Sequence, residues 1–259
     1  MIGPKRFVCF NGIGRHGDVL LPWAIADSCD VYYYEAGRLV TPDLLAAEAR
    51  RFRLDQRTGI DLPGEEARMI IPDREWKLRR MKEPWFGGDT ANMAIGQGYV
   101  DLSPLQMACF TASVARDEVT TTPTLLHDPT RPLQRTEKIG LTPAQRAALI
   151  SGMEDCAAKG TGKLLAHPAL GVPGVRIAGK TGTAQKGVQP RQINIAWFIC
   201  YAPVENPTIA LAVALVGDTA GESFEGGRNA VPVAAAVLRK YFEPKSRTTA
   251  PLFQPVRSE

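Results

Sequence analysis

The sequence has little that would indicate a membrane span, a nucleic-acid partner or a disulfide-bonded fold. No apolar run approaches the roughly 18–20 residues that a helix needs to cross a bilayer. The 31 basic and 27 acidic residues leave a net charge of only +4, an excess too small to predict binding to nucleic acid. The five cysteines are odd in number and form no C-x-x-C pair, so neither a disulfide framework nor a zinc knuckle is predicted.

Metal ligands are also poorly represented. Cys9, His16 and Asp18 lie close together in the sequence, but they lack the paired spacing of a metal site. Most of the cysteines stand beside apolar residues, as small buried side chains do. We therefore expect neither a metal nor a cofactor. Residues 1–5 contain no hydrophobic signal region, so the chain as written carries no secretion signal or anchor of its own.

What the sequence does contain is typical of a domain that folds around a core. Of its 259 residues, 44% are hydrophobic and 22% are charged, and this length suits one or two domains. Capping residues mark where several helices begin. The expected helices cover 20–36, 42–52, 104–116, 143–158 and 229–242, with Asp18, Thr41, Ser103 and Thr142 as N-caps of the first four. Residues 72–88 are expected to be loop with one helical turn.

The C-terminal third favours strands. Residues 175–186, 192–202 and 207–216 are rich in Val, Ile and aromatic side chains. The short connectors between them predict an antiparallel meander. Helices first and an antiparallel sheet last predict an α+β fold, and no internal repeat or linker divides the chain.

One short motif allows two interpretations. Residues 174–181 fit G-x-x-x-x-G-K-[ST], the phosphate-binding P-loop. A P-loop follows a buried strand and opens a helix, whereas residues 167–173 contain two prolines, and glycines and a proline follow Thr181. A nucleotide-binding site is therefore the less favoured of the two interpretations.

The second interpretation is the K-T-G element of penicillin-binding proteins and β-lactamases, here Lys180-Thr181-Gly182 followed by Thr183. On a strand at the edge of a site, Lys180 supplies positive charge, and the threonines supply hydroxyls for a carboxylate. Gly182 leaves room for a substrate lying against the strand. A backbone N–H of that strand can face a developing oxyanion.

Longer segments extend this match. Residues 177–185, 194–203, 88–99 and 103–108, together with Ser28-Cys29-Asp30, resemble the motifs of class B penicillin-binding proteins. Residues 74–77 and 84–90 narrow the resemblance to the elongation type, penicillin-binding protein 2. The resemblance runs from about Phe7 to Phe242. Residues 1–242 are therefore expected to form a partial transpeptidase domain, and 243–259 a disordered C-terminal tail.

The resemblance implies a penicillin-binding protein/β-lactamase-like fold, with an antiparallel sheet flanked by helices and its N-terminal part missing. It implies a peptidoglycan DD-transpeptidase that cross-links stem peptides through a serine acyl-enzyme during cell-wall elongation. The expected partners are stem peptides, β-lactams in the intact parent, and membrane proteins of the elongation complex. The parent protein would be anchored in the inner membrane, with this domain in the periplasm.

The roles of individual residues come from the same resemblance. Ser28 would relay a proton to the leaving amine, and Asp30 would bond to the substrate amide or to the lysine beside the nucleophile. Lys180 would polarise Ser28. Thr181 and Thr183 would bind the terminal carboxylate of the substrate beside Gly182, and the Thr183 N–H would form half of the oxyanion hole.

The S-x-x-K motif of the family is missing, since no serine is followed by lysine three positions later. We expect the nucleophile upstream of Phe7, and we expect the 259-residue chain alone to form no acyl-enzyme. Labelling this chain with a fluorescent penicillin should give no covalent band on a denaturing gel, and a band would contradict the expectation. The alternatives are a non-catalytic protein that binds peptidoglycan or an elongation partner, and a hydrolase using Ser28 or Cys29, for which no histidine is obviously placed.

Overall fold

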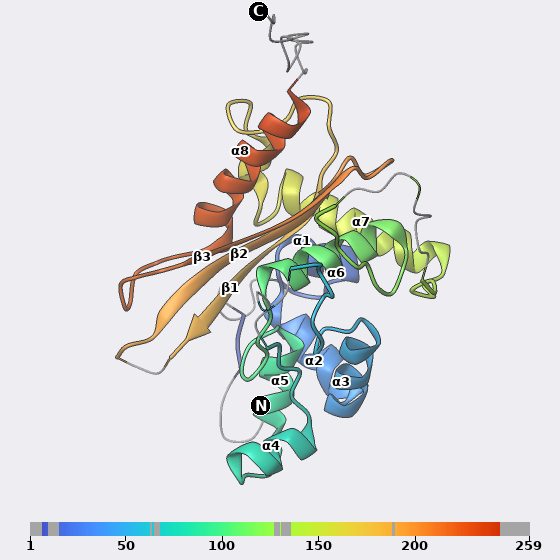
Figure 1. Ribbon diagram of the computed structural model, residues 1–259. Coiled ribbons are helices and arrows are strands. Elements are labelled where there is room, and N and C mark those ends of the chain that lie inside the picture. Colours follow the sequence, from blue (N-terminus) through green and yellow to red (C-terminus); the bar gives the residue numbers. More distant parts are fainter. Residues whose placement is uncertain are drawn as a thin grey trace, which may run out of the picture.

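A three-stranded antiparallel sheet forms the centre of the molecule. The computed structural model describes residues 7–9, 16–62, 64, 68–126, 130, 136–187 and 190–243. β1 (Ala178–Lys186), β2 (Ile193–Ala202) and β3 (Ile209–Val216) pair in that order, so that β1 lies at an edge. Figure 1 shows α8 (Val231–Phe242) on one face of the sheet, and α6 (Pro104–Arg116) and α7 (Pro143–Ala158) on the other.

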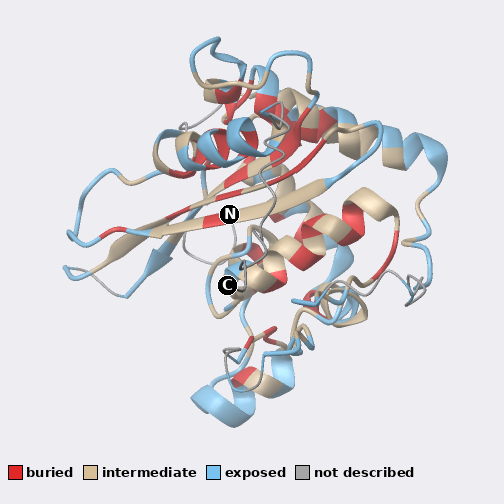
Figure 2. Cartoon of the chain, turned by 45° about the horizontal axis from the view of Figure 1, so that its top comes forward, coloured by how far each residue is buried: buried red, intermediate tan, exposed pale blue. Residues whose placement is uncertain are grey.

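Side chains alternate along β2 and build a core on each face of the sheet. On one face, buried residues of β2 pack with buried residues of α8: Ala196, Phe198, Cys200 and Ala202 with Val231, Ala234, Ala235 and Leu238. On the other face, Tyr201 packs with Ile25, Val114 and Met153. Figure 2 shows these buried positions in red along the sheet and on the helices that cover it. Each large apolar side chain buried in this way contributes about 1.5–3 kcal/mol.

A second group of helices lies below the sheet in Figure 1. α1 (Leu21–Ala26) packs against α7, and α2 (Asp30–Val40) packs against α5 (Gly87–Ala94) and α3 (Pro42–Arg51). α4 (Arg74–Met81) projects at the far end of this group. A 3-10 turn η1 (Lys163–Ala166) follows α7, and a π-helical turn η2 (Gly226–Ala230) leads into α8.

The predictions that rest on capping residues are largely confirmed. Ser103 accepts a hydrogen bond from the Gln106 N–H at the start of α6, and Thr142 forms a capping box with Gln145 at the start of α7. α3 begins after Thr41 as predicted, although the Thr41 hydroxyl makes no capping bond. The α+β class and the antiparallel meander are also confirmed, with the strands starting one to three residues later than expected.

Two predictions are wrong. The helix expected over 20–36 is broken at residues 27–29 into α1 and α2, and it is preceded by Leu20, not capped by Asp18. The break lies at Ser28, whose φ of +54° is incompatible with a right-handed helix. Residues 72–88 hold α4 and the start of α5. Asp73 caps α4 by accepting the Trp76 N–H at 2.6 Å.

A buried ion pair holds α4 against α5. Lys77 is 2% exposed, and its ammonium lies 2.7 Å from the Asp89 carboxylate. The same ammonium lies 4.7 Å from the centroid of the Phe86 ring, and Asp89 also accepts the Phe86 N–H. A charge removed from water needs such partners, so this pair anchors the projecting helix.

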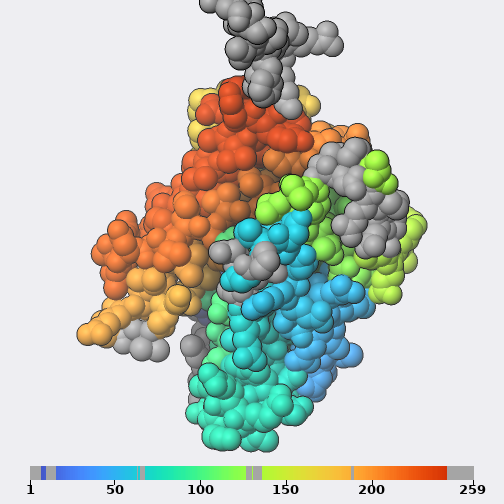
Figure 3. Space-filling view, viewed as in Figure 1, coloured from blue at the N-terminus to red at the C-terminus, as the bar shows by residue number. Residues whose placement is uncertain are grey.

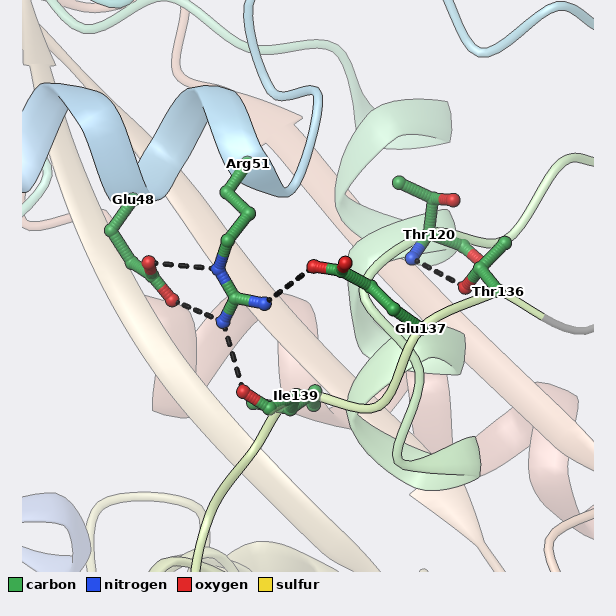
Figure 4. Close-up of polar contacts among 6 residues, drawn as sticks. All are labelled: Glu48, Arg51, Thr120, Thr136, Glu137 and Ile139. Carbon is green, nitrogen blue, oxygen red and sulfur yellow. Dashed lines mark hydrogen bonds and ion pairs between the residues drawn. The ribbon is translucent and has the colours of Figure 1, made fainter.

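An arginine at the end of α3 joins the helical group to the segment that leads into α7. Arg51 donates to both carboxylate oxygens of Glu48, to Glu137 and to the Ile139 carbonyl, as Figure 4 shows. Beside it, the Thr136 hydroxyl accepts from the Thr120 N–H at 3.2 Å. These contacts place the exit of α6 and the approach to α7 next to α3.

Among the described residues, no helix combines the length and apolar character required for a transmembrane segment. Residues 244–259, nearly all of the expected tail, lie outside the described part of the chain.

Candidate active site

The site is built around a contact between two residues that are 152 positions apart. The Lys180 ammonium donates a hydrogen bond of 2.8 Å to the Ser28 hydroxyl. A second bond of 2.8 Å runs from this ammonium to the Thr181 carbonyl oxygen and fixes the direction of the lysine side chain. β1 supplies Lys180, and the turn between α1 and α2 supplies Ser28. The structure therefore brings the S-x-D and K-T-G motifs together.

The backbone at Ser28 is held in a conformation that non-glycine residues adopt uncommonly. Its φ is +54°, and its N–H bonds to the Ile25 carbonyl while the Cys29 N–H bonds to the Ala24 carbonyl. Such strain persists only where neighbouring contacts impose it, and it is concentrated at functional sites. Asp30 follows as the first residue of α2, so the motif spans the turn and the helix start.

Burial lowers the pKa of Lys180, because removal from water disfavours the charged amine, and the nearby Cys156 and Asp30 oppose this only in part. An amine with a lowered pKa loses its proton more readily near neutral pH. Lys180 can therefore donate a hydrogen bond to the Ser28 oxygen and can also take part in moving a proton through it.

Thr181 connects the site to the turn after α7. Its hydroxyl shares a 2.6 Å hydrogen bond with the Thr161 hydroxyl, which also bonds to the Ala26 carbonyl at the end of α1. The Thr161 N–H donates to that same carbonyl. Thr161 therefore links β1 to the end of α1, and its 3.3 Å contact with the Cys156 thiol adds α7. The role of Thr181 in binding a carboxylate stays a prediction.

Gly182 and Thr183 lie against η2. The Gly226 N–H is 3.4 Å from the Thr183 hydroxyl oxygen, which accepts it. A Cβ added at Gly226 would overlap the carbonyl oxygens of Trp197 and Gly182, so the backbone of η2 lies directly on β1 and β2. Thr183 itself is exposed.

Replacing Gly226 with alanine is expected to lower the free energy of unfolding by about 1–3 kcal/mol, because the added methyl group forces backbone apart. Gly88→Ala is the matched control, since a Cβ there would make only ordinary contacts, at 3.5 Å, with Phe7. Urea unfolding of both variants measures the difference. Equal stability of the two variants would contradict this packing.

Gln97 reaches the outer edge of β1 from the turn after α5. Its carboxamide donates to the Thr183 carbonyl at 2.9 Å and accepts from the Gln185 N–H at 3.1 Å. The sequence indicates no role for this residue beyond its place in the I-G-Q-G segment, because its partner Thr183 lies 86 residues away.

A group of possible metal ligands lies close to Ser28, whose carbonyl oxygen accepts from the Cys9 thiol at 3.9 Å. Cys9, His16 and Cys29 place one ligand atom each within 4.8 Å of one another, beside a cavity of about 390 Å³. Nitrogen and sulfur donors of this kind suit a zinc-like ion. Burial raises the pKa of the Cys29 thiol and disfavours the thiolate that a metal requires. Asp18, considered in the sequence, lines the cavity but is not one of the three; the expected absence of a metal stays a prediction.

The P-loop interpretation is wrong. Lys180 and Thr181 lie inside β1, which continues to Lys186, and no helix begins after Thr181 in the described residues up to 187. The lysine points to a serine hydroxyl, not into a ring of backbone N–H groups at a helix start.

Of the predicted site residues, Ser28 and Lys180 are in direct contact, Asp30 acts electrostatically on Lys180, and Thr181, Gly182 and Thr183 follow along β1. Thr161, Gly226 and Gln97 were not recognised as site residues. Glycines flank Thr161 and Gln97, and these turns at 160–162 and 96–98 are the only signals for the two residues in the sequence.

Known proteins are similar to this chain in sequence and in fold. The model of the penicillin binding protein transpeptidase domain family matches residues 14–239. The peptidoglycan D,D-transpeptidase MrdA of Haemophilus influenzae is 33% identical over 261 aligned positions, which cover 92% of this chain and 38% of that protein. The chain therefore spans about two fifths of this relative.

Solved structures agree with the sequence comparison. PBP2 of Pseudomonas aeruginosa in complex with WCK 5153 superposes with a TM-score of 0.75 at 31% identity, covering 94% of this chain and 54% of that chain. PBP2 of Helicobacter pylori in its complex with MreC gives a TM-score of 0.72 at 30% identity, covering 92% and 42%. The penicillin-binding-protein-like fold expected from the sequence is thereby confirmed.

Proposed function

Because this chain belongs to the penicillin-binding protein transpeptidase domain family, we propose that it is part of a peptidoglycan DD-transpeptidase that cross-links stem peptides during cell-wall elongation. The curated relatives that it matches at about one third identity are peptidoglycan D,D-transpeptidases. The chain spans 38% of the H. influenzae relative, so the activity of the whole protein is part of the proposal.

The observation that carries the proposal is the 2.8 Å bond between Lys180 and Ser28. A lysine with a lowered pKa beside a serine hydroxyl is an arrangement for moving a proton. A lysine on the protein surface would lie in solvent, and its pKa would be shifted only weakly. The strained backbone of Ser28 adds a second feature that is typical of functional sites.

In the proposed reaction, the oxygen of a serine nucleophile bonds to the carbonyl carbon of the penultimate D-Ala, and the C–N bond to the terminal D-Ala breaks. The proton that leaves the nucleophile's hydroxyl reaches the leaving amine through the Ser28 hydroxyl, and Lys180 keeps that hydroxyl polarised. The Thr183 N–H bonds to the oxyanion that forms, and Thr181 and Thr183 bind the terminal carboxylate. Asp30 supports the charge on Lys180. An amine of a neighbouring strand then bonds to the acyl carbon, the ester C–O bond breaks, and the proton lost by the amine returns to the serine oxygen.

Substitution of Ser28 tests this function. In the full-length gene product that carries these residues, Ser28→Ala is expected to lower the rate of acylation by a fluorescent penicillin about 10²–10⁴-fold, because the proton relay is lost. The rate is measured from band intensity on denaturing gels against time. Ser246→Ala, in the expected tail, is the control and should label at the unsubstituted rate.

The same labelling experiment distinguishes a transpeptidase from the main alternative, a non-catalytic protein that binds peptidoglycan. A protein that binds stem peptides without chemistry would bind a peptide ending in D-Ala-D-Ala and would give no labelled band with or without Ser28. That result would overturn the transpeptidase proposal.

The cellular setting is proposed from the relatives. H. pylori PBP2 is found in a complex with MreC, and a peptidoglycan synthase complex that coordinates polymerization and crosslinking contains a chain with a TM-score of 0.69 to this one. We propose that the protein works at the periplasmic side of the inner membrane beside membrane proteins of the elongation complex.

A further inference from the structure

Gln97 occupies the place of a neighbouring strand at the outer edge of β1. Its carboxamide bonds to the Thr183 carbonyl and to the Gln185 N–H at the same time. These are the groups that an added strand would pair with, since within the described part of the chain β1 pairs with β2 on its other side and with no strand at this edge. In Figure 3 the gold segment that contains β1 projects to the left of the teal lobe that contains α4.

The turn that presents Gln97 is well defined. Gly96 has a φ of +74° and its N–H bonds to the Met93 carbonyl, while the Gln97 N–H bonds to the Asn92 carbonyl. These two bonds form the Schellman motif that ends α5. The backbone of Gln97 is therefore fixed, and only its side chain has to rotate to leave β1.

One of the two groups taken by Gln97, the Thr183 carbonyl, is a group that an acyl donor needs. In an antiparallel strand the N–H and C=O of one residue point to the same side. Because the Thr183 carbonyl faces Gln97, the Thr183 N–H, which we propose as an oxyanion donor, faces the same outer edge. A donor residue whose carbonyl accepts this N–H would, as an antiparallel pair, offer its own N–H to the Thr183 carbonyl.

We propose that Gln97 is a displaceable latch, and that an acyl donor replaces it with the amide N–H of its own reacting residue. This inference rests on the proposed transpeptidase function. Gln97 then determines which acyl donors are accepted. A donor with an amide N–H beside its reacting carbonyl replaces the bond from Gln97 to the Thr183 carbonyl, and a donor without that N–H does not. Both latch bonds are exposed, so they are weak enough to exchange.

The test compares two β-lactams on the full-length gene product. Benzylpenicillin carries an acylamino N–H beside its reacting carbonyl, and penicillanic acid lacks it. Gln97→Ala is expected to raise the second-order rate constant of acylation by benzylpenicillin about tenfold, because two hydrogen bonds no longer have to be broken. The rate constant for penicillanic acid should change less than about twofold. Gln56→Ala, an exposed glutamine outside the site, is the matched control.

Hydrogen exchange gives a second readout that a purely structural role would not produce. In the unsubstituted protein, the Gln185 N–H should exchange faster after acylation by benzylpenicillin, because the latch has opened, and should be unchanged after acylation by penicillanic acid.

Three results would overturn the latch. If Gln97→Ala lowers the acylation rate constants of both ligands, the role of Gln97 is to stabilise β1. If it raises both equally, Gln97 blocks access to the site whatever the ligand. No acylation of the unsubstituted protein by either ligand would overturn the proposed function and the latch together, which distinguishes that failure from the other two.

Discussion

Replacing Asp89 with alanine is expected to lower the free energy of unfolding by about 3–5 kcal/mol, the largest effect on stability that the structure indicates. The substitution leaves the Lys77 ammonium buried without its 2.7 Å partner. The remaining carboxylate, Glu83, lies 3.7 Å away and is largely exposed. Asp89→Ala also removes the acceptor for the Phe86 N–H at the start of α5.

Urea unfolding of the full-length gene product, followed by tryptophan fluorescence, measures this loss. Asp89→Asn keeps an acceptor for the Phe86 N–H but removes the negative charge. Its loss of stability therefore measures the effect of the charge apart from the effect of the capping hydrogen bond. The double variant Lys77→Met/Asp89→Leu removes both charges and should recover most of the stability, because no buried charge is left unpaired. A loss below about 1 kcal/mol in Asp89→Ala would show that Lys77 finds water or another partner.

The pH dependence of this effect has a definite sign. Burial alone would lower the pKa of Lys77, but the hydrogen bond and charge of Asp89, with Tyr99 and Glu83, outweigh it and the pKa is raised above 10.5. A raised lysine pKa contributes stability that is complete below the unfolded value and is lost as pH rises through the folded value. In Asp89→Ala the burial of Lys77 is no longer offset by Asp89, so its pKa falls below the ordinary value and the variant regains stability as pH rises from that lowered pKa. The difference between the unsubstituted protein and Asp89→Ala should therefore be present at neutral pH and should shrink as pH rises from the lowered pKa of the variant through the raised pKa of the unsubstituted protein.

Replacing Lys180 with methionine is expected to lower the rate of acylation by a fluorescent penicillin about 10²–10⁴-fold, the largest expected effect on activity. Methionine fills a similar volume but cannot donate to the Ser28 hydroxyl or to the Thr181 carbonyl. The measurement is the second-order rate constant in the full-length gene product. Lys180→Arg keeps the charge in a different shape and should retain part of the activity. A rate within threefold of the unsubstituted value in Lys180→Met would remove Lys180 from the mechanism.

Stability should respond to Lys180→Met in the opposite direction from activity. Because burial lowers the pKa of Lys180, the folded state disfavours its charge at neutral pH, and removing the amine should leave stability unchanged or raise it. As pH rises from the lowered folded pKa towards 10.5, the unsubstituted protein should gain stability relative to Lys180→Met. Loss of activity together with retained stability would mark Lys180 as a functional and not a structural residue.

The sequence by itself determined the elements whose signals are local. α6 and α7 begin at Ser103 and Thr142 because each hydroxyl accepts a backbone N–H three residues later, an interaction that needs no tertiary contact. The strands follow from runs of β-branched and aromatic residues joined by short connectors, which leave an antiparallel meander as the simplest pairing. The S-x-D and K-T-G motifs likewise mark Ser28 and Lys180 as candidate site residues from sequence alone.

Where local sequence preference and tertiary packing disagree, only the tertiary structure determined the outcome. Residues 20–36 favour one helix, but the contacts of β1 and the turn at Thr161 with the end of α1 hold Ser28 at a positive φ and break it. The sequence does not predict α4, because this polar segment is stabilised by the ion pair of the buried Lys77 with Asp89, which lies 12 residues further along the chain. Gln97, Thr161 and Gly226 act through backbone groups of distant segments. Such contacts leave no periodic or compositional trace in the sequence, because any chain segment offers the same N–H and C=O groups.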